Sequence, residues 1–353
     1  TLHASLPQQI ELKTRQEKTV TTLLVDALVL ATGNLPPRSH GFSKGLISAS
    51  QFYVDNVWQP LLNQRFPQRV SELSADDEIV IIGAGLTMVD TVLTLKMHGF
   101  KGTITAISRS GLLPQPHAFG DPYPEWEWIY STEYAPRTAL GLLRRLREEV
   151  AAAEAKGFTW QSVVDSVRPV TQNLWKQLST TEKRKFLSRL FTLWNVHRHR
   201  MAPEIHTQIR ALQQSGMLKI VAGKIYYIGS DSEGVTVAFR RRGTNRMETL
   251  RPALTLNCTG PDYDIASSEH TLLKNLRDRE LITIGPLRAG IEVDGSGAAK
   301  GKNAKTIFPV GMLMIGELLE TTAVPELREQ AANTAERLLK HLEALAEPIY
   351  HEI

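Results

Sequence analysis

The chain has 353 residues, 42% of them hydrophobic and 22% charged, a composition typical of a globular protein with two domains or one large one. Its net charge of +4 is too small for this length to indicate a nucleic-acid partner, and no apolar run reaches the roughly 20 residues of a membrane span. The start of the chain lacks the pattern of a secretory signal, and the single cysteine, Cys258, allows no internal disulfide, so we expect a cytoplasmic protein.

Short strands are predicted near the amino terminus. Residues 9–13 and 19–22 have the composition of strands, and the apolar run 23–31 leads into a glycine turn at Thr32-Gly33. A linker and a short helix near residues 50–65 are expected to follow. These elements precede the most informative motif of the chain.

This motif is a strand, a Gly-x-Gly turn and a helix in direct succession. The apolar strand 79–82 ends at Gly83 and Gly85, and the predicted helix begins with Leu86 and Thr87. The first glycine permits a tight turn, the second lets a pyrophosphate approach the backbone, and the start of the helix offers free N–H groups. The motif therefore predicts a dinucleotide-binding loop.

The next strand completes a βαβ unit and indicates which nucleotide is bound. It is predicted over residues 103–110 and ends in Ser108, Arg109 and Ser110, where the adenosine ribose would lie. An NAD site would carry Asp or Glu there, whereas hydroxyls and a guanidinium suit a 2'-phosphate, so NADPH is favoured over NADH. The alternatives are that Arg109 is a solvated residue and, since Met88 replaces the third glycine of the fingerprint, that the two glycines serve packing alone.

A proline-rich loop and a helical region follow. The loop 112–124 contains four prolines, which exclude regular structure, and His117 within it is a weak candidate for contact with substrate or nicotinamide. The alternative is a surface-loop histidine. Residues 136–215 have helical spacing but no motif that can be assigned, and the histidines near their end have basic neighbours, so no metal site is expected.

Strands resume after this helical insert, and a helix closes the chain. The predicted strands are 218–222, 224–228, 235–240 and 254–257. The last of them leads into a second Thr-Gly pair, Thr259-Gly260. The final helix is expected to run to about residue 346, and its start contains Ala323, Val324 and Pro325, with the proline suited to the first turn.

Outside the Gly-x-Gly unit the chain offers little catalytic chemistry of its own. No Ser/His/Asp order, acid/base carboxylate pair or metal-ligand spacing stands out, which is typical of an enzyme whose cofactor carries the reaction. Basic clusters such as residues 240–242 are interpreted mainly as solvated faces, although they could also attract a nucleotide polyanion.

Three features together resemble a known family. They are Thr32-Gly33 before the Gly-x-Gly unit, Thr259-Gly260 after it, and the run 316–328 around the start of the final helix. Their order is similar to that of bacterial FAD/NAD(P)-binding oxidoreductases of the two-dinucleotide-binding-domain superfamily, which are related to flavin monooxygenases and to lysine and ornithine N-hydroxylases. The resemblance implies an α/β fold and two cofactors, FAD and NADP.

The resemblance also implies a domain organisation. Residues 46–253, including the insert 136–215, would form a Rossmann-like NAD(P)-binding domain. This domain would be inserted into a partial, three-layer FAD-binding domain made of residues 1–45 and 254–353. The two Thr-Gly pairs would line the junction of the domains, and the final helix, from Ala323 onward, would approach the flavin.

The start of the chain departs from the family. Such proteins open with a strand and a Gly-x-Gly-x-x-Gly loop that bind the FAD pyrophosphate, and nothing before Leu23 can take that part. We expect the missing βαβ segment on a cleaved amino-terminal piece or on a second chain.

The implied activity is that of a FAD-dependent, NADPH-using oxidoreductase with a small-molecule substrate. Its reduced flavin would either activate oxygen for N- or S-hydroxylation or reduce another acceptor. The alternative function is a nucleotide-binding sensor or scaffold protein that keeps the fold without turnover.

Overall fold

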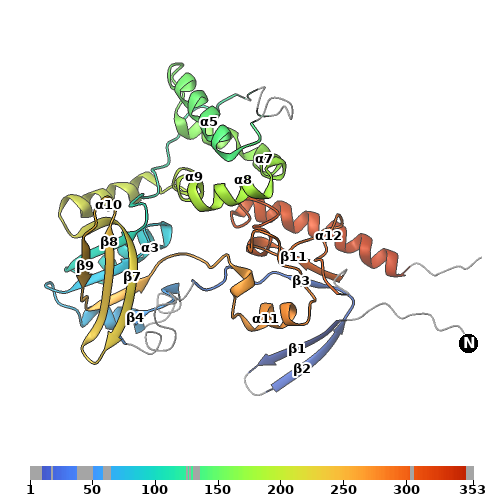
Figure 1. Ribbon diagram of the computed structural model, residues 1–353, viewed down its shortest axis with the longest axis horizontal. Helices are drawn as coiled ribbons and strands as arrows, with labels where there is room; N and C mark the ends of the chain where they lie inside the picture. Colours follow the sequence, from blue (N-terminus) through green and yellow to red (C-terminus); the bar gives the residue numbers. More distant parts are fainter. Residues whose placement is uncertain are drawn as a thin grey trace, which may run out of the picture. The chain divides into compact units, whose positions relative to one another are not determined.

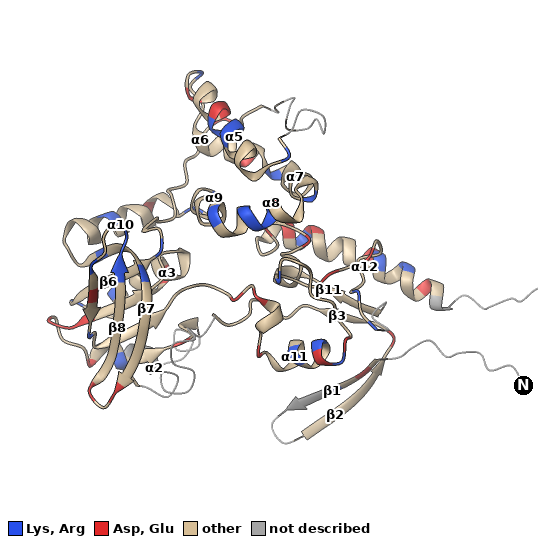
Figure 2. Ribbon diagram, viewed as in Figure 1, with Lys and Arg blue, Asp and Glu red and all other residues tan. Residues whose placement is uncertain are grey.

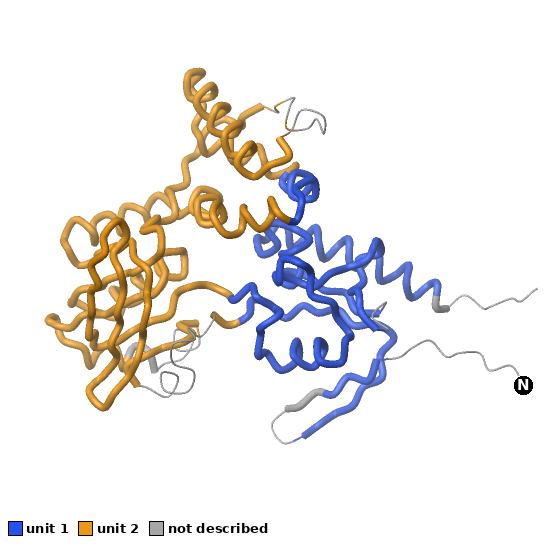
Figure 3. Tube along the Cα trace, viewed as in Figure 1, with its two compact units in different colours: residues 1–35, 171–180, 262–353 blue, residues 36–170, 181–261 orange. Residues whose placement is uncertain are grey.

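The computed structural model describes residues 10–16, 19–37, 51–58, 65–124, 126, 129, 136–302 and 306–346. The chain divides into two compact units (Figure 3). Unit 1 contains residues 1–35, 171–180 and 262–353, and unit 2 contains residues 36–170 and 181–261. In the described part of the chain, no helix is both long enough and apolar enough to cross a membrane.

Unit 2 is built on a seven-stranded sheet in the order β4-β10-β5-β6-β7-β8-β9. Strands β4, β7, β8 and β9 of this sheet are labelled in Figure 1. The strands are β4 (Tyr53–Val54), β5 (Glu78–Ile82), β6 (Thr103–Ser108), β7 (Leu218–Asp231), β8 (Gly234–Arg241), β9 (Met247–Leu250) and β10 (Leu254–Asn257). Strands β4, β10, β5, β6 and β7 are parallel, whereas β7, β8 and β9 pair in antiparallel fashion. The almost continuous burial of β5, β6 and β10 is typical of a parallel sheet that is covered on both faces.

The helical character expected for residues 136–215 is confirmed. The helices with most of their residues in unit 2 are α2 (Arg65–Ser71), α3 (Leu86–Met97), α5 (Ala139–Glu154), α6 (Trp160–Ser166), α8 (Thr180–Lys185), α9 (Phe191–Arg198) and α10 (Pro203–Gln214). A π-helical turn, Phe186–Leu190, separates α8 from α9. The helix expected near residues 50–65 is not found in the first part of this range, because residues 51–58 contain a turn and the strand β4; residues 59–64 lie outside the described residues, and α2 begins at Arg65.

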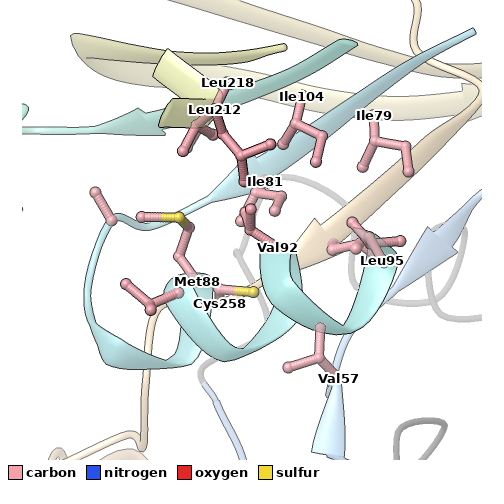
Figure 4. Close-up of a cluster of buried hydrophobic side chains, with 14 of the residues drawn as sticks. Val57, Ile79, Ile81, Met88, Val92, Leu95, Ile104, Leu212, Leu218 and Cys258 are labelled. Atoms are coloured by element: carbon pink, nitrogen blue, oxygen red, sulfur yellow. The ribbon is translucent and has the colours of Figure 1, made fainter. Parts of the chain in front are cut away.

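Helix α3 packs on the parallel strands through an apolar face (Figure 4). Met88, Val92 and Leu95 on α3 are fully buried in the same cluster as Ile81 and Ile104 of the sheet. Burying one such side chain contributes roughly 1.5–3 kcal/mol. Met88, which stands where the fingerprint has its third glycine, is therefore a core residue, and this packing holds the start of α3 at the end of β5.

Unit 1 gathers three separate stretches of the chain. Its strands are β1 (Ile10–Gln16), β2 (Thr19–Val25), β3 (Leu28–Leu30) and β11 (Ile307–Pro309), and its helices are α7 (Thr171–Gln177), α11 (Thr271–Asp278) and α12 (Val324–Ala346). β1 and β2 form an antiparallel hairpin, while β3 and β11 form a two-stranded parallel sheet. Leu30, Leu273 and Leu313 lie in its buried core.

The structure corrects two of the predicted strands. The apolar run 23–31 is not one strand, because a bend at Asp26 separates the end of β2 from β3. The strands predicted at 218–222 and 224–228 are one long strand, β7, with an irregularity between Ile225 and Tyr227.

The unit boundaries also differ from the predicted domain limits. Strand 254–257, expected to open the second FAD-domain segment, is β10, and it lies between β4 and β5 in the sheet of unit 2. Residues 171–180, expected inside the NAD(P)-domain insert, belong to unit 1. The chain passes between the units after residues 35, 170, 180 and 261, and the first and last of these crossings come directly after the two Thr-Gly turns.

Candidate functional site

The turn after β5 is closely packed against the end of β10. Gly83 has a φ of +110°, and a Cβ at this position would lie 2.3 Å from the carbonyl oxygen of Cys258. The Gly83 N–H donates to the Ile107 carbonyl, and the Cys258 N–H donates to the Ile82 carbonyl, each at 2.8 Å. Glycine is therefore required at position 83 by the packing of the backbone, which agrees with the alternative that this glycine serves packing.

Gly85 has no such packing. Its φ is −86°, which any residue can adopt, and no atom lies within 4 Å of the position that a Cβ would occupy. In the described part of the chain, nothing accepts a hydrogen bond from the N–H groups of Leu86 and Thr87, and the Gly85 carbonyl takes its first helical bond from Met88 at 3.0 Å. Open space beside free donors at the positive end of a helix is what a pyrophosphate requires. Packing accounts for Gly83 but not for Gly85.

The loop also lies where the strand order reverses. From β5 the chain leads through α3 to β6 on one side, while β10, which comes much later in the chain, pairs with the other side of β5. Ligands of such sheets bind outside the carboxyl ends of the strands at this reversal. The Thr259-Gly260 turn follows β10 at this same edge of the sheet.

A buried polar network holds the Thr259 turn. The Thr259 N–H and hydroxyl donate to Oδ1 of Asn257 at 3.2 and 2.8 Å. Asn257 is fully buried, and its Nδ2 lies 3.4 Å from Oδ1 of Asp55, which also accepts from the Tyr53 hydroxyl at 3.2 Å. Burial and the nearby Asp55 carboxylate raise the pKa of Tyr53, so this hydroxyl stays protonated and donates. Asn257 was not among the predicted site residues, although a lone amide at the end of an apolar strand was a usable signal.

Two serine hydroxyls and a guanidinium lie at the end of β6, where the sequence predicts an adenosine ribose. Ser108 Oγ accepts from the Gly111 N–H at 3.0 Å, and Ser110 Oγ accepts from the Leu112 N–H at 3.2 Å. Each hydroxyl keeps its own proton for donation to a ligand. Arg109 is exposed, and within the described ranges no carboxylate lies within ion-pair distance of its guanidinium. An anionic ligand would meet a cation that is not already neutralised by an ion pair.

Cys258 lies close to the loop but is chemically quiet. Its side chain is buried, and its Sγ lies 3.4 Å from the Thr91 hydroxyl. Burial raises the pKa of the thiol to about 12, so the nucleophilic thiolate is scarce at neutral pH. The residue is a packing element between α3 and β10.

His117 is tied by its backbone to the end of the helical insert. Its N–H donates to the Met201 carbonyl at 2.7 Å, and its ring packs edge-on against Phe119 at 4.8 Å between centroids. No contact of His117 with the Gly-x-Gly loop is found among the described residues, so its role in substrate contact stays a prediction. The described residues contain no group of three or more His, Cys, Asp or Glu side chains that could hold a metal ion.

The remaining predicted site residues lie in unit 1. Gly33 has a φ of +68°, which explains the glycine in the first Thr-Gly turn. Helix α12 begins at Val324, which is 70% exposed, with Pro325 in its first turn and the Leu327 N–H donating to the Ala323 carbonyl at 2.9 Å. The described part of unit 1 contains no strand, Gly-x-Gly loop and helix in succession, so it offers no loop of this kind for a FAD pyrophosphate.

Helix α7 supports the segment that precedes α12. The Gln172 side-chain amide donates to the Leu319 carbonyl and accepts from the Leu319 N–H, the latter at 3.0 Å. The Trp175 indole donates to the Gly316 carbonyl at 3.3 Å. Glu320, which follows Leu319, is buried and has a φ of +58°. This backbone conformation is costly in a residue other than glycine, and the hydrogen bonds from α7 to the neighbouring backbone hold it in place.

Comparison with known proteins identifies solved structures with a similar fold. No protein-family model matches the chain. Ornithine hydroxylase from Pseudomonas aeruginosa is similar with a TM-score of 0.59 and 14% identity over 97% of this chain and 69% of that one. L-lysine 6-monooxygenase from Pseudomonas syringae has a TM-score of 0.58 and 15% identity over 96% of this chain and 68% of that one. Ornithine N-hydroxylase from Kutzneria sp. 744 has a TM-score of 0.59 and 12% identity over 95% of this chain and 68% of that one.

The chain thus has a fold similar to that of these ornithine and lysine hydroxylases. The similarity extends over nearly the whole chain, and it confirms the resemblance inferred from the two Thr-Gly pairs and the final helix. At 12–15% identity the likeness is one of fold.

Proposed function

We propose that the chain binds NADPH in unit 2 and serves a FAD-dependent oxidoreductase that acts on a small molecule as an N- or S-hydroxylating monooxygenase. The observation that carries the proposal is the Gly85 turn, where open space meets the free N–H groups of Leu86 and Thr87. This arrangement suits a ligand with an anionic group, and a dinucleotide pyrophosphate has that chemistry.

Each part of the nucleotide has matching residues. Gly85, Leu86 and Thr87 would hold the pyrophosphate, and Arg109 would bind the 2'-phosphate. Thr259, held by Asn257, would lie beside the nicotinamide end of the nucleotide. Bound NADPH would supply a hydride, and the task of the protein residues is to orient the nucleotide and to exclude water from it.

Support for the flavin comes from related folds and from unit 1. The structure of a cadaverine monooxygenase from Erwinia amylovora, with a TM-score of 0.55 and 15% identity over 96% of this chain and 65% of that one, is bound to FAD. The Kutzneria structure contains reduced FAD, NADP+ and L-ornithine. In this chain the residues around Ala323, Val324 and Pro325 would approach the flavin. Thr32 and Gly33 would also approach it, just before the chain first passes from unit 1 to unit 2.

We further propose that a βαβ segment, on a cleaved amino-terminal piece or on a second chain, completes the FAD site. Among the described strands, β3 pairs only with β11, and Val29 at its centre is 40% exposed. A two-stranded sheet with a free edge is marginal in water, and a further parallel strand would pair with that edge.

The cofactor assignment is tested by calorimetric titration with NADP+ and NAD+. NADP+ is expected to bind more tightly, and Arg109→Gln is expected to narrow the difference by roughly 1–3 kcal/mol, since it removes a charge-assisted hydrogen bond. Equal affinities for the two nucleotides in the parent protein would remove the basis for a 2'-phosphate site at the end of β6.

A nucleotide-binding sensor or scaffold is the second candidate function. The absence of a FAD pyrophosphate loop from the described part of unit 1 favours it. The two functions differ in turnover, so NADPH oxidation should be followed with FAD and the complementing segment supplied. Nucleotide binding without oxidation would favour the sensor.

A further inference from the structure

The end of β6 is bordered by a second element, the β7–β8 hairpin. β7 pairs with β6 as far as Ala222, which lies opposite Ser108, and then continues beyond the end of β6. β8 returns in the antiparallel direction and ends at Arg241, and Arg242 follows directly. The hairpin therefore brings Arg242 beside the turn that contains Arg109. Figure 2 shows the Lys and Arg positions of the chain in blue, including those on β7 and β8.

Hydrogen bonds hold Arg242 in this place. Its N–H donates to the Ala222 carbonyl at 2.8 Å, and its Nη1 lies 3.4 Å from the Ser110 carbonyl oxygen. Like Arg109, Arg242 is exposed and, as far as the described chain shows, has no carboxylate within ion-pair distance. Two guanidinium groups thus border one turn without a neutralising partner.

The arginines that precede Arg242 are engaged elsewhere. Arg241 donates through Nε and Nη2 to the two carboxylate oxygens of Glu248, at 2.8 and 2.9 Å. The Arg240 guanidinium lies 5.2 Å from the centre of the Tyr226 ring. Of the three consecutive arginines in the described hairpin, Arg242 is the one that contacts the end of β6.

We propose that Arg242 is a second guanidinium for the 2'-phosphate of NADP(H) and, with Arg109, determines the choice of nucleotide. A phosphate monoester carries about −1.5 to −2 charges at pH 7, more than one guanidinium neutralises. Arginine binds phosphate through paired, charge-assisted hydrogen bonds. NAD(H) lacks this phosphate and gains nothing from Arg242. The inference rests on the proposed function, because it requires the adenosine end of a dinucleotide at β6.

The test measures the affinity of the full chain for NADP+ and NAD+, and for 2',5'-ADP and 5'-AMP as fragments with and without the phosphate. Arg242→Gln is expected to weaken NADP+ and 2',5'-ADP about tenfold, the effect of losing one charge-assisted contact, and to leave NAD+ and 5'-AMP within about twofold. Arg241→Gln is the matched control, since it removes the same charge one residue away and is expected to change each affinity less than about twofold. Thermal unfolding of both variants shows whether they are folded.

The outcomes separate this inference from the proposed function. A parent protein that binds neither nucleotide, or binds both equally, overturns the proposed function and this inference with it. A parent that prefers NADP+, with the preference lost in Arg109→Gln but unchanged in Arg242→Gln, overturns the role of Arg242 alone. Equal losses in Arg242→Gln and Arg241→Gln also overturn it, because they indicate a general charge effect.

Discussion

Gly83 and Gly85 are two positions apart, and the structure gives them different tasks. A side chain at Gly83 would collide with the backbone of β10, whereas one at Gly85 would enter open space. The sequence motif alone could not distinguish a packing role from a ligand-binding role, because both positions are glycine. The difference becomes a test of whether the loop binds a ligand.

Gly85→Val is expected to fold with nearly the stability of the parent protein and to bind NADP+ at least about tenfold more weakly, since its side chain occupies the space of the pyrophosphate. Gly83→Val is expected to lose roughly 1–3 kcal/mol or more of stability through its φ and its clash. Chemical unfolding and calorimetry measure the two effects. A Gly85→Val protein with unchanged affinity would contradict the dinucleotide site and support packing alone.

The stability of unit 2 should depend on alkaline pH through Cys258. Burial raises the pKa of the thiol from 9.0 to about 12, so between these values the unfolded chain loses a proton that the folded chain retains. The unfolded state then binds fewer protons, and the free energy of unfolding falls by up to about 1.4 kcal/mol per pH unit.

The measurement compares the parent protein with Cys258→Ala by urea unfolding at pH 8.5 and 10.5. The parent is expected to lose about 2 kcal/mol more than the variant over this range, a value that follows from the same linkage. Identical pH dependence in the two proteins would show that Cys258 titrates alike in the folded and unfolded states.

At the level of elements, α7 joins a stretch of the helical insert to unit 1. Its Gln172 amide makes two hydrogen bonds with the backbone of Leu319, next to the left-handed residue Glu320. Gln172→Ala is expected to destabilise unit 1 by about 1–3 kcal/mol, because it leaves two partly buried backbone groups unpaired. Lys176→Ala, an exposed position on the same helix, is the control and is expected to change stability by less than about 0.5 kcal/mol.

Hydrogen exchange locates the effect of Gln172→Ala. Faster exchange in residues 316–320 of the variant, with unit 2 unchanged, agrees with a positioning role for Gln172. Faster exchange in unit 2 alone would contradict the assignment of α7 to unit 1.

The elements with a strong apolar or helical pattern could be predicted from the sequence, including the four-residue strand β10, whereas two other short strands could not. Helix α3 and strands β5 and β6 follow from an apolar run, a glycine turn and a helical spacing, so the βαβ unit and its loop were identified. β11 has only three residues, and β9, Met-Glu-Thr-Leu, is partly exposed and lies outside any apolar run. The transfer of residues 171–180 to unit 1 depends on contacts with residues far away in the sequence, as does the position of β10 between β4 and β5.

In the candidate site, too, residues marked by a local sequence pattern could be predicted, and residues brought there by the fold could not. Arg109 could be proposed from the sequence because a cation directly follows a strand of a recognisable unit. Arg242 reaches the same turn through the register of β7 and β8, which no local pattern encodes. Asn257 acts through a buried network whose partners are about 200 residues away in the sequence.

At the level of the whole molecule, FAD binding should depend on a complementing βαβ segment. The chain alone is expected to bind NADP+ but to retain little FAD, because no Gly-x-Gly loop for a second pyrophosphate occurs in the described part of unit 1. Addition or co-expression of the segment is expected to give one FAD per chain, measured by flavin absorbance and native mass spectrometry. A chain that carries stoichiometric FAD without a second polypeptide would contradict the proposal.

The pairing of β3 with β11 also bears on how the chain is made. Leu28 of β3 pairs with Ile307 of β11, so the two strands leave a ribosome about 280 residues apart. At roughly 5–20 residues per second this interval is on the order of 15–60 s, during which unit 2 can be completed while β3 lacks this neighbour. We therefore expect β3 to lack this pairing partner throughout that interval, and a chaperone that acts during translation would protect its unpaired edge.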